Sequence, residues 1–225
     1  MSVITSDRTG NPAGDEGAAE APRRRAGRPS AREAEIKHSA MLEAALEEFS
    51  RHGFHGASVR AIAERAGLST RTLYNRYADK AALFAASLEM SALQDTARPA
   101  PALGDLRAEL IRFVRHMLGR LNQDRQVRLA RVIFRECISF PQLEAISRSQ
   151  YERFQLEPTM AILVRHGIAQ SRARELAVFY VALTFNRWQS RVIYDEPAMG
   201  PAELTRHVEA ATDLFLRGAL AQGAE

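Results

Sequence analysis

The chain has 225 residues, of which 46% are hydrophobic and 26% charged, so it holds enough apolar side chains to bury a sizeable core. Its 31 basic and 27 acidic residues give a formal net charge of +4, which excludes a generic polycation. Positive charge can attract nucleic acid only where it is locally concentrated. The single cysteine, Cys137, excludes an internal disulfide and a cysteine-rich zinc site, and we expect neither a metal nor a cofactor.

No segment has the character of a membrane span or a secretory signal. The longest apolar run, from Leu176 to Phe185, is shorter than the roughly 18 residues that cross a bilayer. The amino terminus has no apolar stretch ahead of its arginines, so a signal peptide is not expected. We therefore predict a cytoplasmic protein without membrane contact.

Residues 1–31 differ in composition from the rest of the chain. They are rich in Gly, Ala, Pro, Ser, Thr and charged residues and have almost no large apolar side chains, so we expect this segment to be disordered. The run from Arg23 to Pro29 makes it a basic arm whose Arg25 and Arg28 suit the narrow minor groove of A·T-rich DNA. The alternative is a solubilising tail that does not touch DNA.

Residues 34–94 read as short helices joined by a tight turn. Ser58 is suited to cap a helix whose inward positions recur at helical spacing, and Gly67 supplies the positive φ that ends it. Ser69 or Thr70 caps the following helix, and Asp79 caps a fourth.

The helix after Gly67 has an unusually polar surface. Only Leu73 and the ring of Tyr77 are evident core anchors. Hydroxyl, guanidinium and amide groups hydrogen-bond phosphate oxygens and base edges, so this helix is a candidate reader of a DNA groove. The side chains left free are Thr70, Arg71, Thr72, Tyr74, Asn75 and Arg76.

This segment resembles the DNA-binding domain of the TetR family of bacterial transcriptional regulators, over about a quarter of the chain. The resemblance implies an all-α fold: an N-terminal three-helix helix-turn-helix DNA-binding domain (34–94), followed by a C-terminal helical effector-binding and dimerisation domain (103–222). The matching positions are Met41, Leu42, Ala44, Ala45, Phe49, Gly53, Ser58, Ile62, Ala63, Ala66, Gly67, Thr72, Leu73, Tyr74, Tyr77, Lys80 and Leu83.

The resemblance also implies the DNA contacts. Residues at the start of the second helix touch phosphates, the first turn of the third enters the major groove, and Arg71 is suited to a guanine through O6 and N7. Lys80 is placed for a backbone phosphate. The alternatives are that Arg60 and Lys80 are solvated charges, that Tyr74 lies in the core and that Thr72 only packs. The complete expected set is Ser58, Arg60, Thr70, Arg71, Thr72, Tyr74, Asn75, Arg76, Tyr77 and Lys80, with Arg25 and Arg28 of the arm.

The remaining chain reads as helices throughout, with no strand pattern and no internal repeat. We expect helices over 106–121 and 127–134, a stretch over 141–166 that Pro158 interrupts near Glu157, and two long helices over 171–194 and 201–221. The run from Arg128 to Cys137, followed by Phe140-Pro141-Gln142-Leu143, is similar to the C-terminal domain of an AefR-like branch of the family.

In the TetR family the last two helices pair with those of a second subunit in a four-helix bundle. A homodimer would set two recognition helices about 34 Å apart on a palindromic site in double-stranded DNA. The alternative is a helical pair buried only within the subunit. The residues expected at this surface are Leu176, Phe179, Tyr180, Leu183, Thr184, Arg187, Leu204, Val208, Ala211, Thr212, Phe215 and Leu216, with the small residues Ala177, Ala182 and Ala210.

Family members of this type usually release DNA when a small molecule fills a cavity in the helical domain. An apolar or aromatic effector is expected here, and it must prefer the conformation whose recognition helices are spaced wrongly for DNA. Plain core packing is the alternative for each candidate residue. The candidate lining is Phe113, Met117, Phe134, Cys137, Phe154, Met160, Tyr180 and Trp188.

The function predicted is therefore a nucleoid-associated, sequence-specific repressor that a small effector releases. A transcriptional activator of the same fold and a thiol redox sensor acting through Cys137 are alternatives, as is an architectural DNA protein without effector control. We do not expect an enzyme, because Cys137 has no Asp or Asn partner in a recognisable motif, and neither a phosphate-binding glycine loop nor metal-ligand spacing accompanies it.

Overall fold

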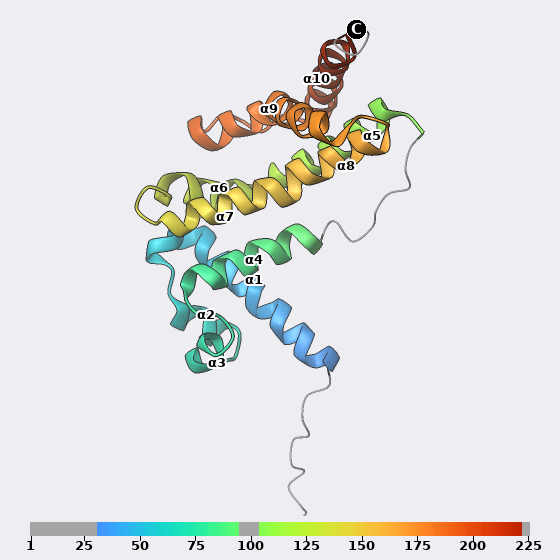
Figure 1. The fold of residues 1–225 in the computed structure, drawn as a ribbon. Coiled ribbons are helices and arrows are strands. Elements are labelled where there is room, and N and C mark those ends of the chain that lie inside the picture. The colour runs from blue at the N-terminus through green and yellow to red at the C-terminus, as the bar shows by residue number, and fades with distance from the viewer. Residues whose placement is uncertain (1–30, 95–103, 222–225) are drawn as a thin grey trace, which may run out of the picture.

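The computed structural model describes residues 31–94 and 104–221, and all of the regular structure in them is helical. The all-α expectation is thereby confirmed (Figure 1). The helices are α1 (Ala31–Gly56), α2 (Val59–Arg65), α3 (Thr70–Tyr74), α4 (Lys80–Gln94), α5 (Leu106–Leu121), α6 (Asp124–Glu136), α7 (Pro141–Tyr151), the π-helical turn η1 (Glu152–Leu156), α8 (Glu157–Arg165), α9 (Gln170–Tyr194) and α10 (Pro201–Ala221).

Within residues 31–94, capping side chains and a glycine with positive φ determine where helices begin and end. The Oγ of Ser58 accepts the Ala61 amide at 3.3 Å, and Oδ1 of Asp79 accepts the Ala82 amide at 2.7 Å, so both helix starts are capped. Gly67 has φ 65°, the conformation that an L side chain rarely adopts, and it turns the chain from α2 into α3.

A cluster of aromatic rings holds α1 against α4. Phe49, Phe54 and Phe84 are buried, with ring centroids 4.6 to 6.0 Å apart. The same cluster of buried residues continues into Leu129 and Val132 of α6. Helix α6 therefore packs directly on α1 and is part of the core that supports the small N-terminal helices.

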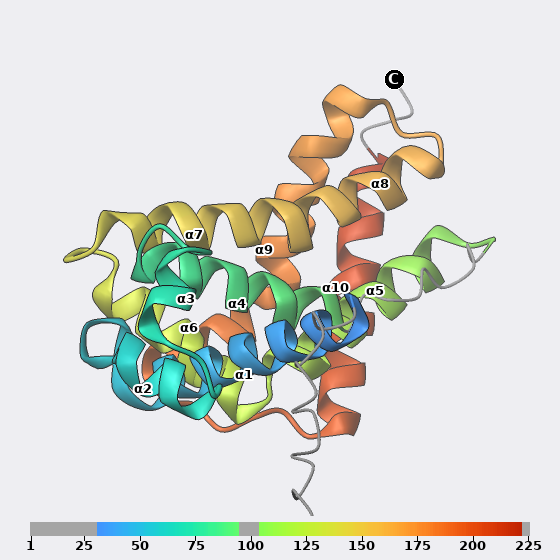
Figure 2. The same cartoon turned by 90° about the horizontal axis from the view of Figure 1, so that it is seen from below.

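The second buried cluster lies among α5, α8, α9 and α10. Its centre includes Tyr180, whose hydroxyl lies 2.8 Å from Oγ1 of Thr212 in a fully buried contact between α9 and α10. Helix α10 packs against α5 and α9, and Figure 2 shows it crossing α5. Helices α2 and α3 lie at one end of the molecule, and α9 and α10 lie at the other (Figure 1).

The interruption expected near Glu157 takes the form of a π-helical turn. The Glu157 amide donates to the Glu152 carbonyl five residues back, and Pro158, which has no N–H, follows immediately. Phe154 and Leu156 of this turn are buried, so the widened turn does not loosen the packing there. It lets α7, η1 and α8 run as one rod over α4 and α5 (Figure 2).

Candidate nucleic-acid interface and ligand cavity

The polar helix α3 stands at the surface and is anchored by one residue. Leu73 is 1% exposed, whereas Tyr74 is 54% exposed. The Ser69 Oγ accepts the Thr72 amide at 3.1 Å and lies 2.8 Å from the Thr72 hydroxyl, which fixes the start of the helix. The members of the expected DNA-contacting set that are exposed are Ser58, Arg60, Thr70, Arg71, Thr72, Tyr74, Asn75 and Arg76.

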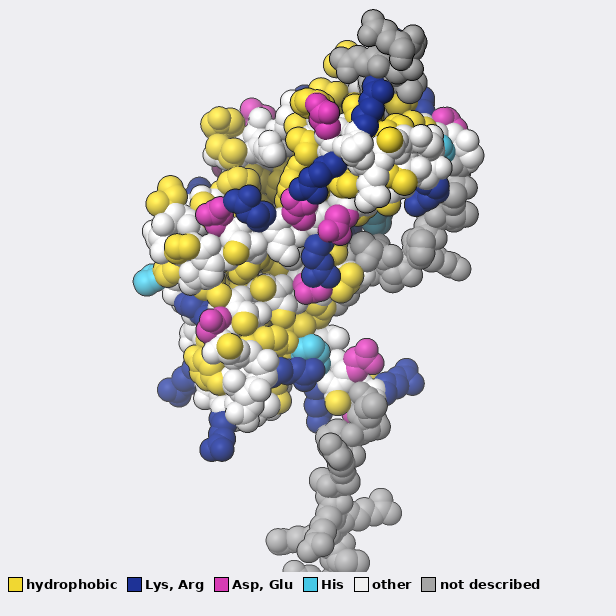
Figure 3. Space-filling view, viewed as in Figure 1, with side chains coloured by type: hydrophobic (Ala, Val, Ile, Leu, Met, Phe, Trp, Pro, Cys, Tyr) yellow, Lys and Arg dark blue, Asp and Glu magenta, His cyan; other side chains and the backbone are white. Residues whose placement is uncertain are grey.

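Positive charge gathers over this end of the molecule. Figure 3 shows dark blue side chains projecting from the lower end, where Figure 1 places α2 and α3. Arg60 pairs with Glu64 at 2.8 Å, and this hydrogen bond raises the pKa of the guanidinium. The exposed arginines around α2 and α3 are Arg51, Arg60, Arg65, Arg71 and Arg76.

Lys80 is less free than a solvated charge. Its Nζ donates to the carbonyls of His55 at 3.0 Å and Ala57 at 3.2 Å, and it lies 5.0 Å from the centroid of the Phe54 ring. Since an ammonium has three donors, these two bonds leave one for a phosphate. The sequence alone does not reveal this role, because the carbonyls belong to a turn more than 20 residues upstream.

Tyr77 is half-buried at the end of the α3 segment. Its hydroxyl lies 2.6 Å from Nε2 of His38 on α1. Burial raises the pKa of the Tyr77 hydroxyl. The pKa of His38 is lowered, first by burial and then by the nearby positive charge of Arg76. The pair ties the end of the recognition segment to α1. Arg25 and Arg28, the expected contacts of the arm, lie outside the described residues.

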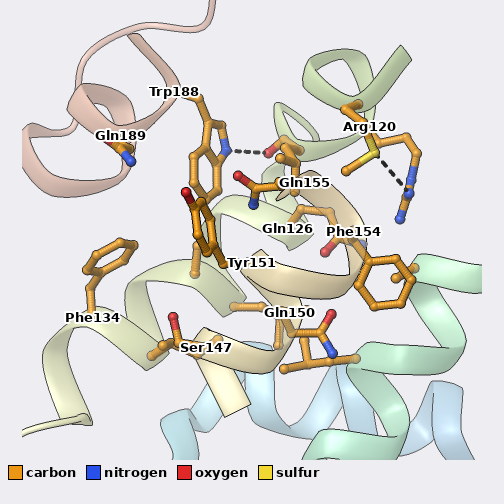
Figure 4. Close-up of a pocket in the computed structure, with 17 residues that line it drawn as sticks. Arg120, Gln126, Phe134, Ser147, Gln150, Tyr151, Phe154, Gln155, Trp188 and Gln189 are labelled. Carbon is orange, nitrogen blue, oxygen red and sulfur yellow. Dashed lines mark hydrogen bonds between the residues drawn. The ribbon is translucent and has the colours of Figure 1, made fainter. Parts of the chain in front are cut away.

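A cavity of about 180 Å³ lies between α4, α5, α6, the α7–η1 rod and α9. It brings together Met117, Phe134, Phe154 and Trp188 of the expected effector-binding set (Figure 4). The other four expected residues, Phe113, Cys137, Met160 and Tyr180, do not line it. Tyr180 is fully buried between α9 and α10, and Phe113 and Met160 pack against the second core cluster.

The cavity is more polar than its aromatic members suggest. The three glutamines that line it are Gln126, Gln150 and Gln155, and the aromatic side chains of Trp188 and Tyr151 are also part of the lining (Figure 4). The Trp188 Nε1 donates to the Leu121 carbonyl at 3.0 Å, which fixes the indole. The further polar lining residues, which sequence reasoning missed, are Arg120, Ser147 and Gln189. The sequence does not indicate that these glutamines line a cavity, because they come together only when five separate segments pack.

The outward face of α9 and α10 keeps large apolar side chains at the surface. Phe179 is 58% and Leu214 is 62% exposed, and together with Leu183 they line a groove between the two helices. Most of the other residues expected at the subunit interface face the core of this subunit. The buried members are Leu176, Ala177, Tyr180, Thr184, Leu204, Val208, Ala211, Thr212 and Phe215, while Ala182, Arg187 and Ala210 are exposed.

None of the described helices is long and apolar enough to cross a membrane. Within residues 31–94 and 104–221, no three His, Cys, Asp or Glu side chains gather where they could hold a metal ion.

Comparison with known proteins gives three kinds of likeness. A family model for bacterial regulatory proteins of the tetR family matches residues 41–87. The HTH-type transcriptional repressor SCO4008 of Streptomyces coelicolor is 39% identical over 64 residues, which is 28% of this chain and 33% of that protein. The match therefore spans only a third of the relative's own length.

Two solved structures extend the likeness over most of the chain. A TetR-family regulator from Mesorhizobium loti superposes with a TM-score of 0.67 at 23% identity, covering 82% of this chain and 96% of that one. The flavonoid-responsive regulator FrrA has a TM-score of 0.61 at 26% identity, covering 82% of this chain and 97% of its own.

Proposed function

The chain belongs to the TetR family of transcriptional regulators, and we propose that it is a repressor that binds a palindromic operator as a homodimer and is released by a small aromatic effector. A DNA target implies work at the bacterial nucleoid in the cytoplasm. We divide the chain into a basic arm (1–31), a DNA-binding domain (34–94) and an effector-binding and dimerisation domain (103–222).

The observation that carries this function is the geometry of α3. A short capped helix stands on a single buried anchor, Leu73, and turns hydroxyl and guanidinium groups outward beside a concentration of arginines. Such a helix can enter a major groove while the arginines neutralise phosphates. We assign Arg71 to a base edge, and Tyr74 and Arg76 to the backbone.

The exposed groove between α9 and α10 supports the dimer. Isolated monomers rarely leave a contiguous set of large apolar side chains such as Phe179, Leu183 and Leu214 in water. Repeating the face about a twofold axis would bury it and place two copies of α3 on one side of a duplex.

The cavity supports the effector. Its aromatic walls suit a flat ring, and its glutamines, Ser147 and the Tyr151 hydroxyl suit hydrogen-bonding substituents on that ring. FrrA, a structural relative, is by its name responsive to flavonoids. We propose an effector that combines an aromatic ring with hydroxyl or carbonyl groups, which narrows the apolar or aromatic ligand expected from the sequence.

Two alternatives have the same fold and the same DNA-reading helix. An activator would differ only in the sign of control. A thiol sensor would act through Cys137, which is half-buried at the end of α6 and whose Sγ lies 3.5 Å from the Phe134 carbonyl. If alkylating Cys137 left effector-driven DNA release intact, the thiol sensor would be excluded.

The proposed function is tested by selecting binding duplexes from a random pool and footprinting the protein on the best of them. We expect a palindromic sequence and a preference over unrelated duplexes of equal length of roughly a thousandfold or more. Equal binding to all duplexes would identify an architectural DNA protein instead.

A further inference from the structure

Helix α1 is broken one turn before its end. Gly53 has φ 73° and ψ 176°, so the helix stops there and a separate turn follows, closed by the Ala57 amide on the Gly53 carbonyl at 3.2 Å. The first amides of a helical turn have no acceptor within it. The amides of Phe54 and His55 therefore need a partner from elsewhere.

Glu136, the last residue of α6, supplies that partner. Its Oε1 accepts the Phe54 amide at 3.0 Å and its Oε2 accepts the His55 amide at 2.7 Å. A carboxylate on two amides makes charge-assisted bonds, which are stronger than neutral ones. We call this arrangement the Glu136 cap.

The Glu136 cap requires a glycine at position 53. A Cβ on Gly53 would lie 2.5 Å from Oε1 of Glu136 and would also require an unfavourable positive φ. Glycine satisfies both constraints, so the chain break and the approach of the carboxylate occur together.

The capped turn leads straight into the DNA-reading helices. Its carbonyls at His55 and Ala57 accept from Lys80 of α4, and the next residue, Ser58, caps α2. A displacement of this turn would therefore move the start of α2 and the connection to α4.

The helix that ends at Glu136, α6, also lines the cavity. Gln126, Ala130 and Phe134 of α6 face the same space as Trp188. A ligand that fills the cavity would contact α6, and α6 ends in the cap.

We propose that Glu136 couples the cavity to the DNA-binding helices. A shift of α6 carries the carboxylate, the turn at 53–57 and α2 with it, and by linkage DNA binding alters the cavity. Glu136 is a positioning residue, since it does not line the cavity and acts through the amides of Phe54 and His55. This inference rests on the proposed function and adds the residue through which the two sites communicate.

Trp188 provides a readout that needs no known effector. It is the only tryptophan in the chain and it lines the cavity. Acrylamide quenching of its fluorescence would be measured with and without the duplex selected by the protein. In the unmodified protein we expect the duplex to change the quenching constant.

Glu136→Gln keeps the side-chain length but replaces one acceptor by a donor. We expect this variant to bind the duplex, with the change in Trp188 quenching reduced at least about threefold. Glu144→Gln is the matched control, because Glu144 is exposed on α7 and pairs with Arg148 four residues along. It should respond as the unmodified protein does. A full response in E136Q would overturn the proposal.

A second measurement tests the coupling without DNA. Ala130→Phe would place a ring in the cavity, and we expect amide hydrogen exchange at Phe54 and His55 to quicken by about fivefold or more, the lower range of typical coupling. Unchanged exchange in a folded A130F protein would overturn the coupling. Failure to select any duplex would instead count against the proposed DNA-binding function.

Discussion

At the scale of single residues, Arg71 is the side chain on which sequence preference should depend. It is exposed in the first turn of α3, where its guanidinium fork can reach O6 and N7 of a guanine. We expect Arg71→Ala to lose about 1–3 kcal/mol of discrimination at one base pair of the selected duplex. The check is competition binding with single-base variants, with Arg148→Ala on α7 as control. Equal weakening on all variants would reassign Arg71 to the phosphates.

Lys80 should affect stability as well as DNA affinity. We expect Lys80→Ala to lower the free energy of unfolding by about 1–2 kcal/mol, because two carbonyls lose their charged donor. If its third donor reaches a phosphate, the variant also lowers the salt slope of binding by about one. Urea unfolding and salt titrations separate the two effects. An unchanged unfolding free energy would show that the carbonyl contacts contribute nothing.

His38 should make stability depend on pH. Its pKa is lowered from 6.5 in the folded protein, first by burial and then by Arg76, so the unfolded chain binds the proton more readily. Stability is therefore expected to fall as the pH drops through 6.5 toward the folded value. His38→Gln should flatten this part of the curve. Urea unfolding at pH values from about 5 to about 7.5, in steps of about half a pH unit, would measure the pH dependence of the free energy of unfolding.

At the scale of elements, the short helix α3 should depend strongly on the Ser69 cap at its start. The helix has five residues, so it depends on its start more than a long helix does. Ser69→Ala should cost about 1 kcal/mol of unfolding free energy and weaken binding to every duplex. Thr205→Ala on α10, which loses only a bond to the Pro201 carbonyl, is the control. If duplex affinity survived in S69A, the cap would not be what presents α3.

The helices were predictable where the determinants are local. Gly67, Ser58 and Asp79 each act within a few residues, and the corresponding helix ends lie where the sequence places them, whereas the helix expected over 127–134 extends over Asp124–Glu136. The π-helical turn was not predicted, since Pro158 indicates an interruption without specifying its form.

The site was predictable only in part, for the same reason. Exposure of α3 follows from its composition and one anchor, Leu73. The contacts of Glu136 with Phe54 and His55 join residues more than 80 positions apart, which periodicity does not reveal. Likewise, Tyr180 reads as either cavity lining or core until its partner Thr212 is known.

At the scale of the whole molecule, α6 contributes side chains to both buried clusters. Leu129 and Val132 belong to the core that carries the N-terminal helices, while Val127 belongs to the core around α9 and α10. A shared helix means that the two ends of the molecule cannot repack independently. The position of the cavity beside α6 therefore agrees with the proposed control of DNA binding.

The proposed dimer depends on the exposed face of α9 and α10. Phe179→Glu would put a charge where a second copy is expected to pack, and burying an unpaired carboxylate is strongly unfavourable. We expect the variant to be monomeric by light scattering at concentrations where the unmodified protein is dimeric. Its binding to the palindromic duplex should fall by at least about a hundredfold, while binding to a half-site changes little, because only the linkage of two recognition helices is lost.

The matched control is Ile138→Glu, which charges an apolar side chain that is 90% exposed after α6, far from α10 along the chain. This variant should remain dimeric and bind the palindrome normally. A dimeric F179E protein would mean that the subunits meet elsewhere, because no side chain as large as Phe179 can be replaced by a charge at the centre of a dry interface without cost. The spacing of the two α3 helices would then have to be set by another surface.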